Sequence, residues 1–225
     1  MRRWRCLVGS GLILIAAVPA HGEDSWYIAA TAGAYVRDSH VGPVTFTSGN
    51  TKAPGTLDRE FDPGALLGLN VGYKLPDGFR IEGEFGYLRY VNGKIKPSVA
   101  AFPALNGSNF ALLSGDLYNR YTGTINVLYD IPLELSWTPY VGGGLGYAHS
   151  DGVISQHVNS IGTILHGMTA ARDTAVALIE LGITIPITDS WSVVPGYRYV
   201  HFFVNPDRSG DEVAHVAKVE VRYAF

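Results

Sequence analysis

The segment from Val213 to Phe225 constrains the fold of this chain more than any other, because its side chains alternate in character. One set of alternate positions is almost wholly apolar and ends in two aromatic residues: Val213, His215, Ala217, Val219, Val221, Tyr223 and Phe225. The other set carries the charges of Lys218, Glu220 and Arg222. A β-strand sends alternate side chains to opposite faces. This pattern is typical of a strand that lies between lipid and the polar lumen of a barrel.

The N-terminal residues predict a secretory signal peptide over residues 1–22. Three arginines within the first five residues precede the apolar run Cys6–Val18, and small residues follow up to Gly22. The run is too short to cross a bilayer as a helix. We expect cleavage after Gly22, with Ala20 as the alternative, so that residues 23–225 form one domain.

The composition of the remaining chain limits its partners and the way it crosses a membrane. Removal of the three signal-peptide arginines leaves 14 basic against 20 acidic residues, which argues against nucleic acid as a partner. Cys6 is the only cysteine, so no disulfide framework is expected. No later segment approaches 18 consecutive apolar residues. A membrane protein of this composition must therefore cross as the strands of a closed barrel.

Eight segments of about a dozen residues alternate in this way. They are Ser25–Val36, Gly64–Leu75, Phe79–Val91, Asp116–Ile131, Thr138–Ala148, Thr174–Ile187, Trp191–Phe203 and Val213–Phe225. The connections after the second, fourth and sixth segments are short and rich in turn-forming residues, whereas the others are longer. The sequence therefore predicts an all-β fold: an eight-stranded antiparallel up-and-down transmembrane β-barrel with short periplasmic turns and long extracellular loops.

Charged residues recur on the second face of these strands and should line the lumen. They are Glu82, Glu84, Arg120, Glu180, Arg198, Lys218, Glu220 and Arg222. Isolated charges in a narrow interior would be unstable, so we expect Glu82, Glu84 and Glu180 to pair with the basic members as an ionic network. An eight-stranded barrel is just wide enough for its side chains to fill it. The lumen should therefore be plugged, with at most a narrow gated ion path.

Aromatic residues gather on the apolar faces near the short-turn ends of the strands. They are Trp26, Tyr73, Phe79, Tyr129, Trp191, Tyr223 and Phe225. Such belts mark the interface between membrane and water.

Glycines and prolines within the predicted strands also lead to expectations about the backbone. The inward glycines 142, 144 and 146 should give room to bulky neighbours such as Tyr140 and Arg120, and Pro139 and Pro195 should produce bulges or breaks.

A soluble alternative has the same alternation. Barrels of the lipocalin type also have eight strands and follow signal peptides, but they turn their apolar faces inward and act as carriers. Alternation alone does not say which face is inside. The mid-strand charges of both signs, the aromatic ends and the nearly charge-free apolar faces favour lipid outside.

Several stretches resemble the OmpA-type outer-membrane β-barrel family of surface proteins and surface antigens. Residues 26–35 resemble its first strand, residues 139–147 its fifth, and residues 181–199 its sixth strand, turn and seventh strand. Tyr223 and Phe225 resemble the signal that outer-membrane assembly machinery reads. The resemblance implies a Gram-negative outer-membrane protein in contact with lipid and lipopolysaccharide. It implies little about function within that class.

The loops carry the remaining functional hypotheses, because loops on a rigid scaffold often bind ligands. We expect an envelope surface protein with loop-mediated interactions, and the alternative is an adhesin for host or envelope partners. A lipid-modifying enzyme is a further alternative, since His201 lies near the outer rim, but the residue two positions along is Phe203 and not a serine. Residues 161–168 predict a short helix or an extension of the strands. No catalytic, metal or cofactor-binding residues are predicted.

Overall fold

The computed structural model describes residues 25–48, 50–90, 92–115, 118–160, 162–169, 171–203 and 211–225. The expected signal peptide over residues 1–22 and its cleavage point lie outside these ranges. No helix within them has the length and apolar character needed to cross a membrane.

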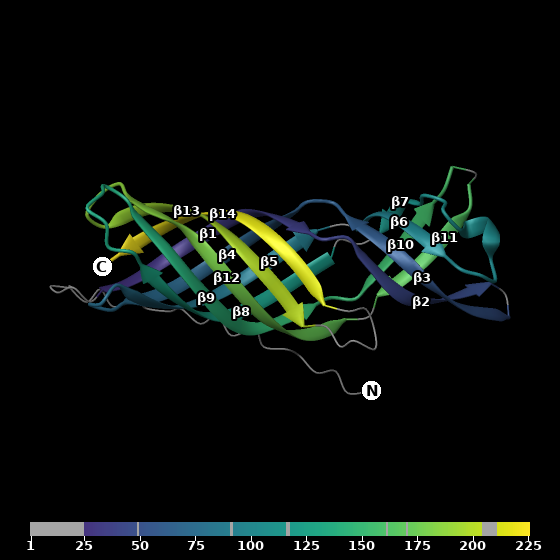
Figure 1. Ribbon diagram of the computed structural model, residues 1–225, viewed down its shortest axis with the longest axis horizontal. Coiled ribbons are helices and arrows are strands. Elements are labelled where there is room, and N and C mark those ends of the chain that lie inside the picture. Colours follow the sequence, from purple (N-terminus) through teal and green to yellow (C-terminus); the bar gives the residue numbers. More distant parts are fainter. Residues whose placement is uncertain are drawn as a thin grey trace, which may run out of the picture.

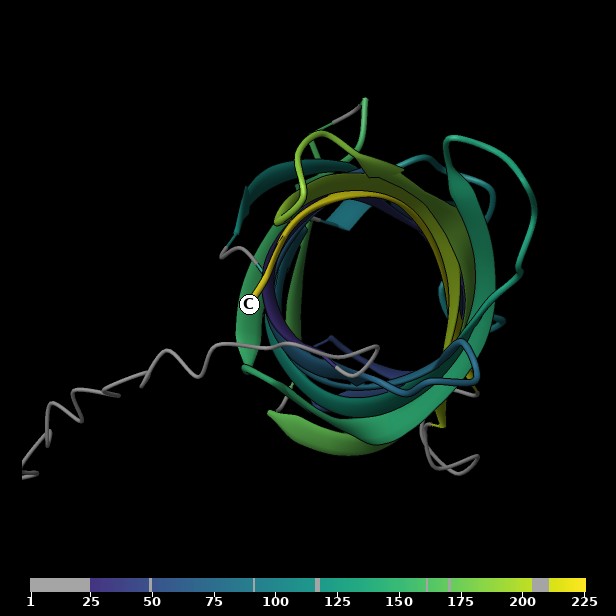
Figure 2. The ribbon, with the colours of Figure 1, turned by 90° about the vertical axis from the view of Figure 1, so that its left-hand side faces the viewer.

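Eight strands form a closed antiparallel barrel (Figures 1 and 2). They are β1 (Ser25–Arg37), β4 (Gly64–Lys74), β5 (Phe79–Tyr90), β8 (Tyr118–Asp130), β9 (Thr138–Ser150), β12 (Arg172–Pro186), β13 (Trp191–Phe203) and β14 (Glu212–Ala224). Each strand pairs with its neighbours along the chain, and β1 pairs with β14 to close the ring. The predicted fold class is confirmed, and the strand boundaries differ from the predicted ones by only a few residues.

The barrel wall turns its apolar face outward. Leu69, Ile125 and Leu145 are 66%, 68% and 69% exposed, whereas Glu82 and Arg120 on the inward face are 0% exposed. A water-soluble carrier would show the opposite arrangement, because exposed apolar surface in water is unfavourable. The lipocalin-like alternative is therefore overturned.

The glycines of β9 lie at positions where residues of the neighbouring strand come close to the backbone. A Cβ atom on Gly142 would come 2.5 Å from the backbone oxygen of Val127, and one on Gly144 would overlap the side chain of Asn126. The neighbours that need this space are therefore on β8, and they include Leu128 and Asn126 in place of the expected Tyr140 and Arg120.

The two prolines within strands behave differently from each other. The ladder between β12 and β9 runs without interruption past Pro139, so the expected break there is wrong. Pro139 stands next to the start of its strand, where the lost N–H matters little. The ladder between β12 and β13 is interrupted at Pro195. It is paired as far as Gly182↔Gly196 and resumes at Ile185↔Val193 in the same register.

The long connections continue beyond the barrel as two small sheets, on the right in Figure 1. One sheet has the order β2-β3-β6, from His40–Ser48, Thr51–Phe61 and Asn92–Ser98. The other has the order β11-β10-β7, from Ile164–Thr169, Val153–Val158 and Ala111–Gly115, and a short 3-10 helix, η1 (Pro103–Leu105), precedes β7. We call these two sheets the head. The C-terminus lies at the opposite end of the molecule (Figure 1).

A single bridge joins the two sheets of the head. Ile95 and Phe110 exchange two backbone hydrogen bonds of 2.9 Å, and both side chains are buried together with Val99. We expected these connections to be loops, with an extension of the strands as one option for residues 161–168. That option is correct for β11, and the other head strands are a correction to the sequence analysis.

Candidate functional site

A buried ionic network fills the middle of the barrel lumen. Arg198 binds both carboxylate oxygens of Glu84 at 2.5 Å, and its Nη2 lies 2.7 Å from Oε2 of Glu180. Lys218 Nζ lies 2.8 Å from the same Glu180 oxygen. Four barrel strands therefore meet through buried ion pairs, and the contacts of Arg198 are charge-assisted hydrogen bonds, which are among the stronger contacts a protein makes.

The network continues toward the short-turn end of the lumen. Arg222 donates to Glu220 at 2.8 Å, and its guanidinium lies 4.5 Å from the centre of the Tyr27 ring. Arg80, which the sequence places inward but which we did not include in the network, pairs with Asp130 at 3.0 Å. The carboxylate of Glu82 is buried beside these groups and accepts no hydrogen bond from any described residue.

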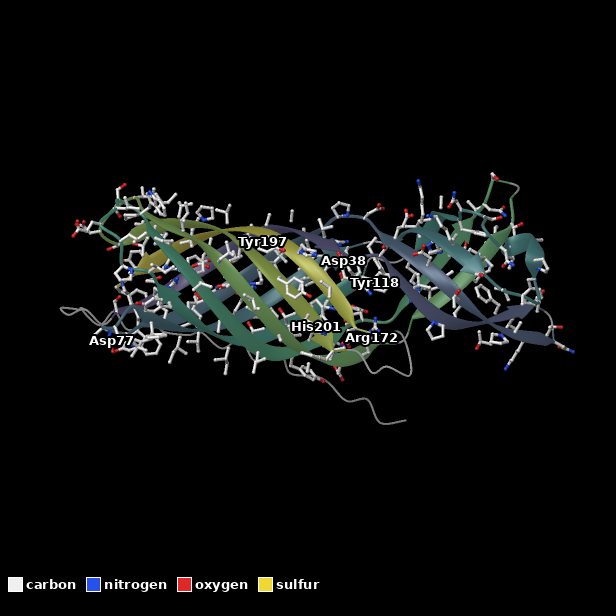
Figure 3. The ribbon with its side chains drawn as sticks, in the orientation of Figure 1. Asp38, Asp77, Tyr118, Arg172, Tyr197 and His201 are labelled. Carbon is white, nitrogen blue, oxygen red and sulfur yellow. The ribbon has the colours of Figure 1, made fainter. Side chains whose placement is uncertain are left out.

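A second charged cluster lies at the head end of the lumen. The buried carboxylate of Glu212 lies 2.8 Å from Arg37 Nη2 and 2.7 Å from Arg120 Nη2, and it also pairs with Arg172. Figure 3 shows Arg172 at the junction between the barrel and the head. Arg120 does not contact the three glutamates that we expected to be its partners. Sequence analysis missed Glu212, because it precedes the segment read as the last strand.

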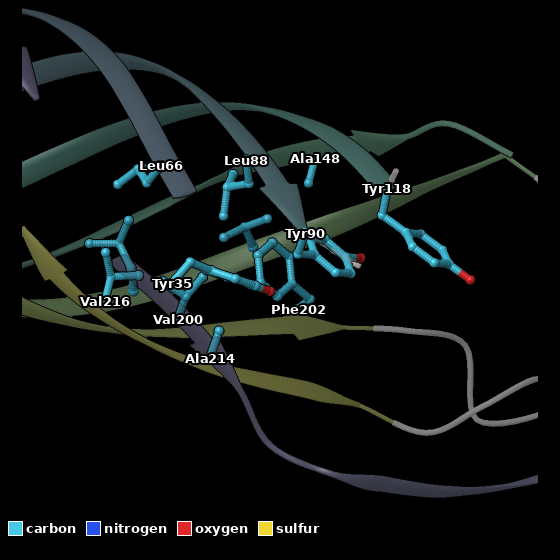
Figure 4. Close-up of a cluster of buried hydrophobic side chains, with 12 residues drawn as sticks. Tyr35, Leu66, Leu88, Tyr90, Tyr118, Ala148, Val200, Phe202, Ala214 and Val216 are labelled. Atoms are coloured by element: carbon cyan, nitrogen blue, oxygen red, sulfur yellow. The ribbon is translucent and has the colours of Figure 1, made fainter. Parts of the chain in front are cut away.

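An apolar layer separates the two charged clusters (Figure 4). Val216 lies between Glu212 and Lys218 on the inward face of β14. On the inward face of β13, Val200 and Phe202 follow Arg198 toward the head. The layer is completed by other buried side chains: Tyr35, Leu66, Leu88, Tyr90, Tyr118, Ala148, Val176, Leu178 and Ala214. A void of about 20 Å³ adjoins it, which is room for about one water molecule. The layer narrows the polar part of the lumen to the β8 side, where Thr122 and Thr124 line the void.

The aromatic residues predicted for the membrane interface lie at the short-turn end of the barrel. Three cross-strand pairs form there, with ring centroids 5.1 Å apart for Trp26–Tyr73 and 4.9 Å apart for both Phe79–Tyr129 and Trp191–Tyr223. The ring of Phe225 lies 5.7 Å from that of Tyr223. Aromatic pairs directly across a ladder stabilise both the sheet and its position in the interface.

Two histidines near the head end of the barrel, His201 and His149, pair with aspartates. His201 Nε2 lies 3.0 Å from Asp211 Oδ2, and its ring packs on Phe203. His149 Nδ1 lies 2.6 Å from Asp173, while the hydroxyl of neighbouring Ser150 accepts a hydrogen bond from Arg120 inside the lumen. Within the described part of the chain, neither histidine contacts a serine as a nucleophile would require.

A cleft opens in the head, and residues of both head sheets line it. It has a volume of about 370 Å³, which is within the range of small-molecule sites. Its lining combines apolar side chains, among them Phe46, Leu57 and Ile164, with the polar side chains of Arg59 and His157. No aspartate or glutamate is among the described residues that line it.

The fold and the lumen together define an outer-membrane β-barrel, with an apolar exterior, aromatic pairs at one rim and charges enclosed within. Residues 9–225 match the family described as outer membrane protein beta-barrel domain. The chain belongs to this family, which places it in the Gram-negative outer membrane.

The chain is also similar to several solved structures. OprG from Pseudomonas aeruginosa is 12% identical with a TM-score of 0.51, and the match covers 89% of this chain and 95% of that one. Neisserial surface protein A is 16% identical with a TM-score of 0.49, covering 91% and 98% respectively. The Ail protein of Yersinia pestis, solved with the heparin analogue sucrose octasulfate, is 13% identical with a TM-score of 0.40, covering 89% and 99%. A search of curated proteins returned no match.

Proposed function

We propose that this protein is a non-conducting surface protein of the outer membrane, which uses a closed barrel to present a structured head to extracellular ligands. The observation that supports the proposal is the division of the molecule into a lumen crossed by a layer of buried apolar side chains and a head with a cleft. The barrel acts as an anchor, and recognition falls to the head. Adhesion to a host or envelope partner is one form that this recognition can take.

The sealed lumen is tested by conductance in planar bilayers. We expect the wild-type protein to give no steady current, because the layer that contains Leu88, Val200 and Val216 excludes water between the two charged clusters. Replacing these three residues by serine should hydrate the layer and produce current events. The matched control replaces three lipid-facing residues, Leu69, Val71 and Val127, by serine. This control should give no current. Steady current through the wild-type protein would contradict the proposal.

The recognition role is tested by shortening the head. Replacing residues 41–60 by a short turn between β1 and β4 removes the β2–β3 hairpin, while both barrel strands keep their partners. We expect the shortened protein to keep the faster gel migration of an unboiled barrel and to lose attachment of whole cells to host cells or envelope material. Cells that attach equally well with the shortened protein would argue against the proposal.

A further inference from the structure

The lining of the head cleft contains a cation that lacks an acidic partner. Arg59 on β3 lines the cleft, and no described carboxylate makes an ion pair with it. Burial lowers the pKa of Arg59, and the positive charges of Arg37 and Arg172 add to that effect. The carboxylate of Glu212 offsets part of this positive charge, but Arg37, Arg120 and Arg172 share that carboxylate. The region around Arg59 therefore keeps an excess of positive charge.

A buried histidine beside Arg59 also lacks a partner. His157 on β10 is 2% exposed and lines the same cleft, and its Nε2 makes no hydrogen bond with any described residue. Burial lowers the pKa of His157, and the charge of Arg59 adds to this, so the imidazole is neutral near pH 7. Buried polar atoms in proteins nearly always have a partner, so a ligand atom bound to this nitrogen would supply the one it lacks.

The other side chains that line the cleft indicate what else a ligand would contain besides a group that binds Arg59 and His157. Phe46, Leu57 and Ile164 present apolar surface, and Ser155 adds a hydroxyl close to His157 in the sequence. An acid group would satisfy the guanidinium and the imidazole, since arginine binds carboxylate and phosphate oxygens through paired hydrogen bonds. An apolar body attached to that group would contact the apolar part of the lining.

We propose that the cleft between the two head sheets binds a small organic anion, with its acid group at Arg59 and His157 and its apolar part against Phe46, Leu57 and Ile164. The inference rests on the proposed role of the head in recognition and names the chemistry of its ligand. The acid group can belong to a soluble ester or to the headgroup of a membrane lipid.

The test uses phenyl phosphate, which combines an acid group with a small apolar body, and the full-length mature protein in nanodiscs of zwitterionic lipid. Titration calorimetry should give saturable binding to the wild-type protein and none with phenol, which lacks the acid. Arg59→Gln should weaken binding at least tenfold, or about 1.4 kcal/mol, and His157→Gln should weaken it less. The matched control, Lys52→Gln, removes an exposed head charge outside the cleft and should bind as the wild type does.

The source of the acid group is resolved in a second arm. Nanodiscs that contain phosphatidic acid should displace phenyl phosphate if the headgroup of a lipid can reach the cleft, and they should leave it bound if the ligand is soluble. Both results support the anion site. Equal binding by Arg59→Gln and the wild type, equal binding of phenol, or no binding by a protein that migrates as a folded barrel would overturn it. If attachment still depends on residues 41–60 in that case, the head recognises its partner elsewhere and the proposed function stands.

Discussion

Replacing Glu212 by glutamine is expected to lower the free energy of unfolding by about 3–5 kcal/mol, the usual effect of breaking a buried ion pair. The carboxylate is the shared partner of Arg37, Arg120 and Arg172, and its side chain is 0% exposed. The amide keeps the shape of the side chain and removes its charge, so the guanidiniums would repel each other without compensation. Urea unfolding in lipid vesicles, followed by the fraction of protein that migrates as an unboiled barrel, measures the change.

The matched control is Glu60→Gln in the head. Glu60 lies 2.8 Å from Lys96, but both side chains are more than 40% exposed. Exposed pairs contribute little to stability, so the urea midpoint should not move. Equal midpoints for the Glu212 variant and the wild type would show that the cluster does not hold the head end of the barrel together.

Replacing Arg198 by methionine should have a similarly large effect, about 3–5 kcal/mol, through the other charged cluster. Its guanidinium binds both oxygens of Glu84 and also contacts Glu180. Methionine fills part of the space and leaves two buried carboxylates with fewer donors. The same urea titration measures the loss, and Arg89→Met on the exposed face of β5 is the control.

A double-mutant cycle separates pairing from packing at this site. If the bidentate pair carries the effect, adding Glu84→Gln to Arg198→Met should destabilise the barrel much less than the sum of the two single changes. Additive effects would indicate that Arg198 acts mainly by filling the lumen.

The eight barrel strands could be predicted because each keeps a period of two over about a dozen residues, as in Val213–Phe225. The head strands could not, for a physical reason. They are shorter, and β2 and β3 contain Pro43, Pro54 and Gly55, which are typical of loops. Their stability comes from pairing with segments far away in the sequence, and a local pattern does not show that pairing.

The arrangement of the lumen was predictable only in part. Alternation places Arg120 inside the barrel, but it does not give the height of a side chain along the barrel axis. The signal for the apolar layer was present in the sequence, because Val200 and Val216 are apolar residues on the face that otherwise carries charges. Apolar residues at the same height on the inward face of several strands form a layer across the lumen. Recognising them in the sequence would have placed Arg120 in a different cluster from Glu84 and Glu180.

The seam between β1 and β14 has a consequence for biogenesis. Eleven residue pairs join these strands, from Tyr27↔Ala224 to Arg37↔Ala214, so the earliest described strand to leave the ribosome closes against the latest. Until β14 has been made, β1 keeps an open edge, which is a hazard for aggregation. Contacts between such distant segments also form slowly. The nascent polypeptide must therefore be kept apart from other copies of itself until β14 has been made and can pair with β1.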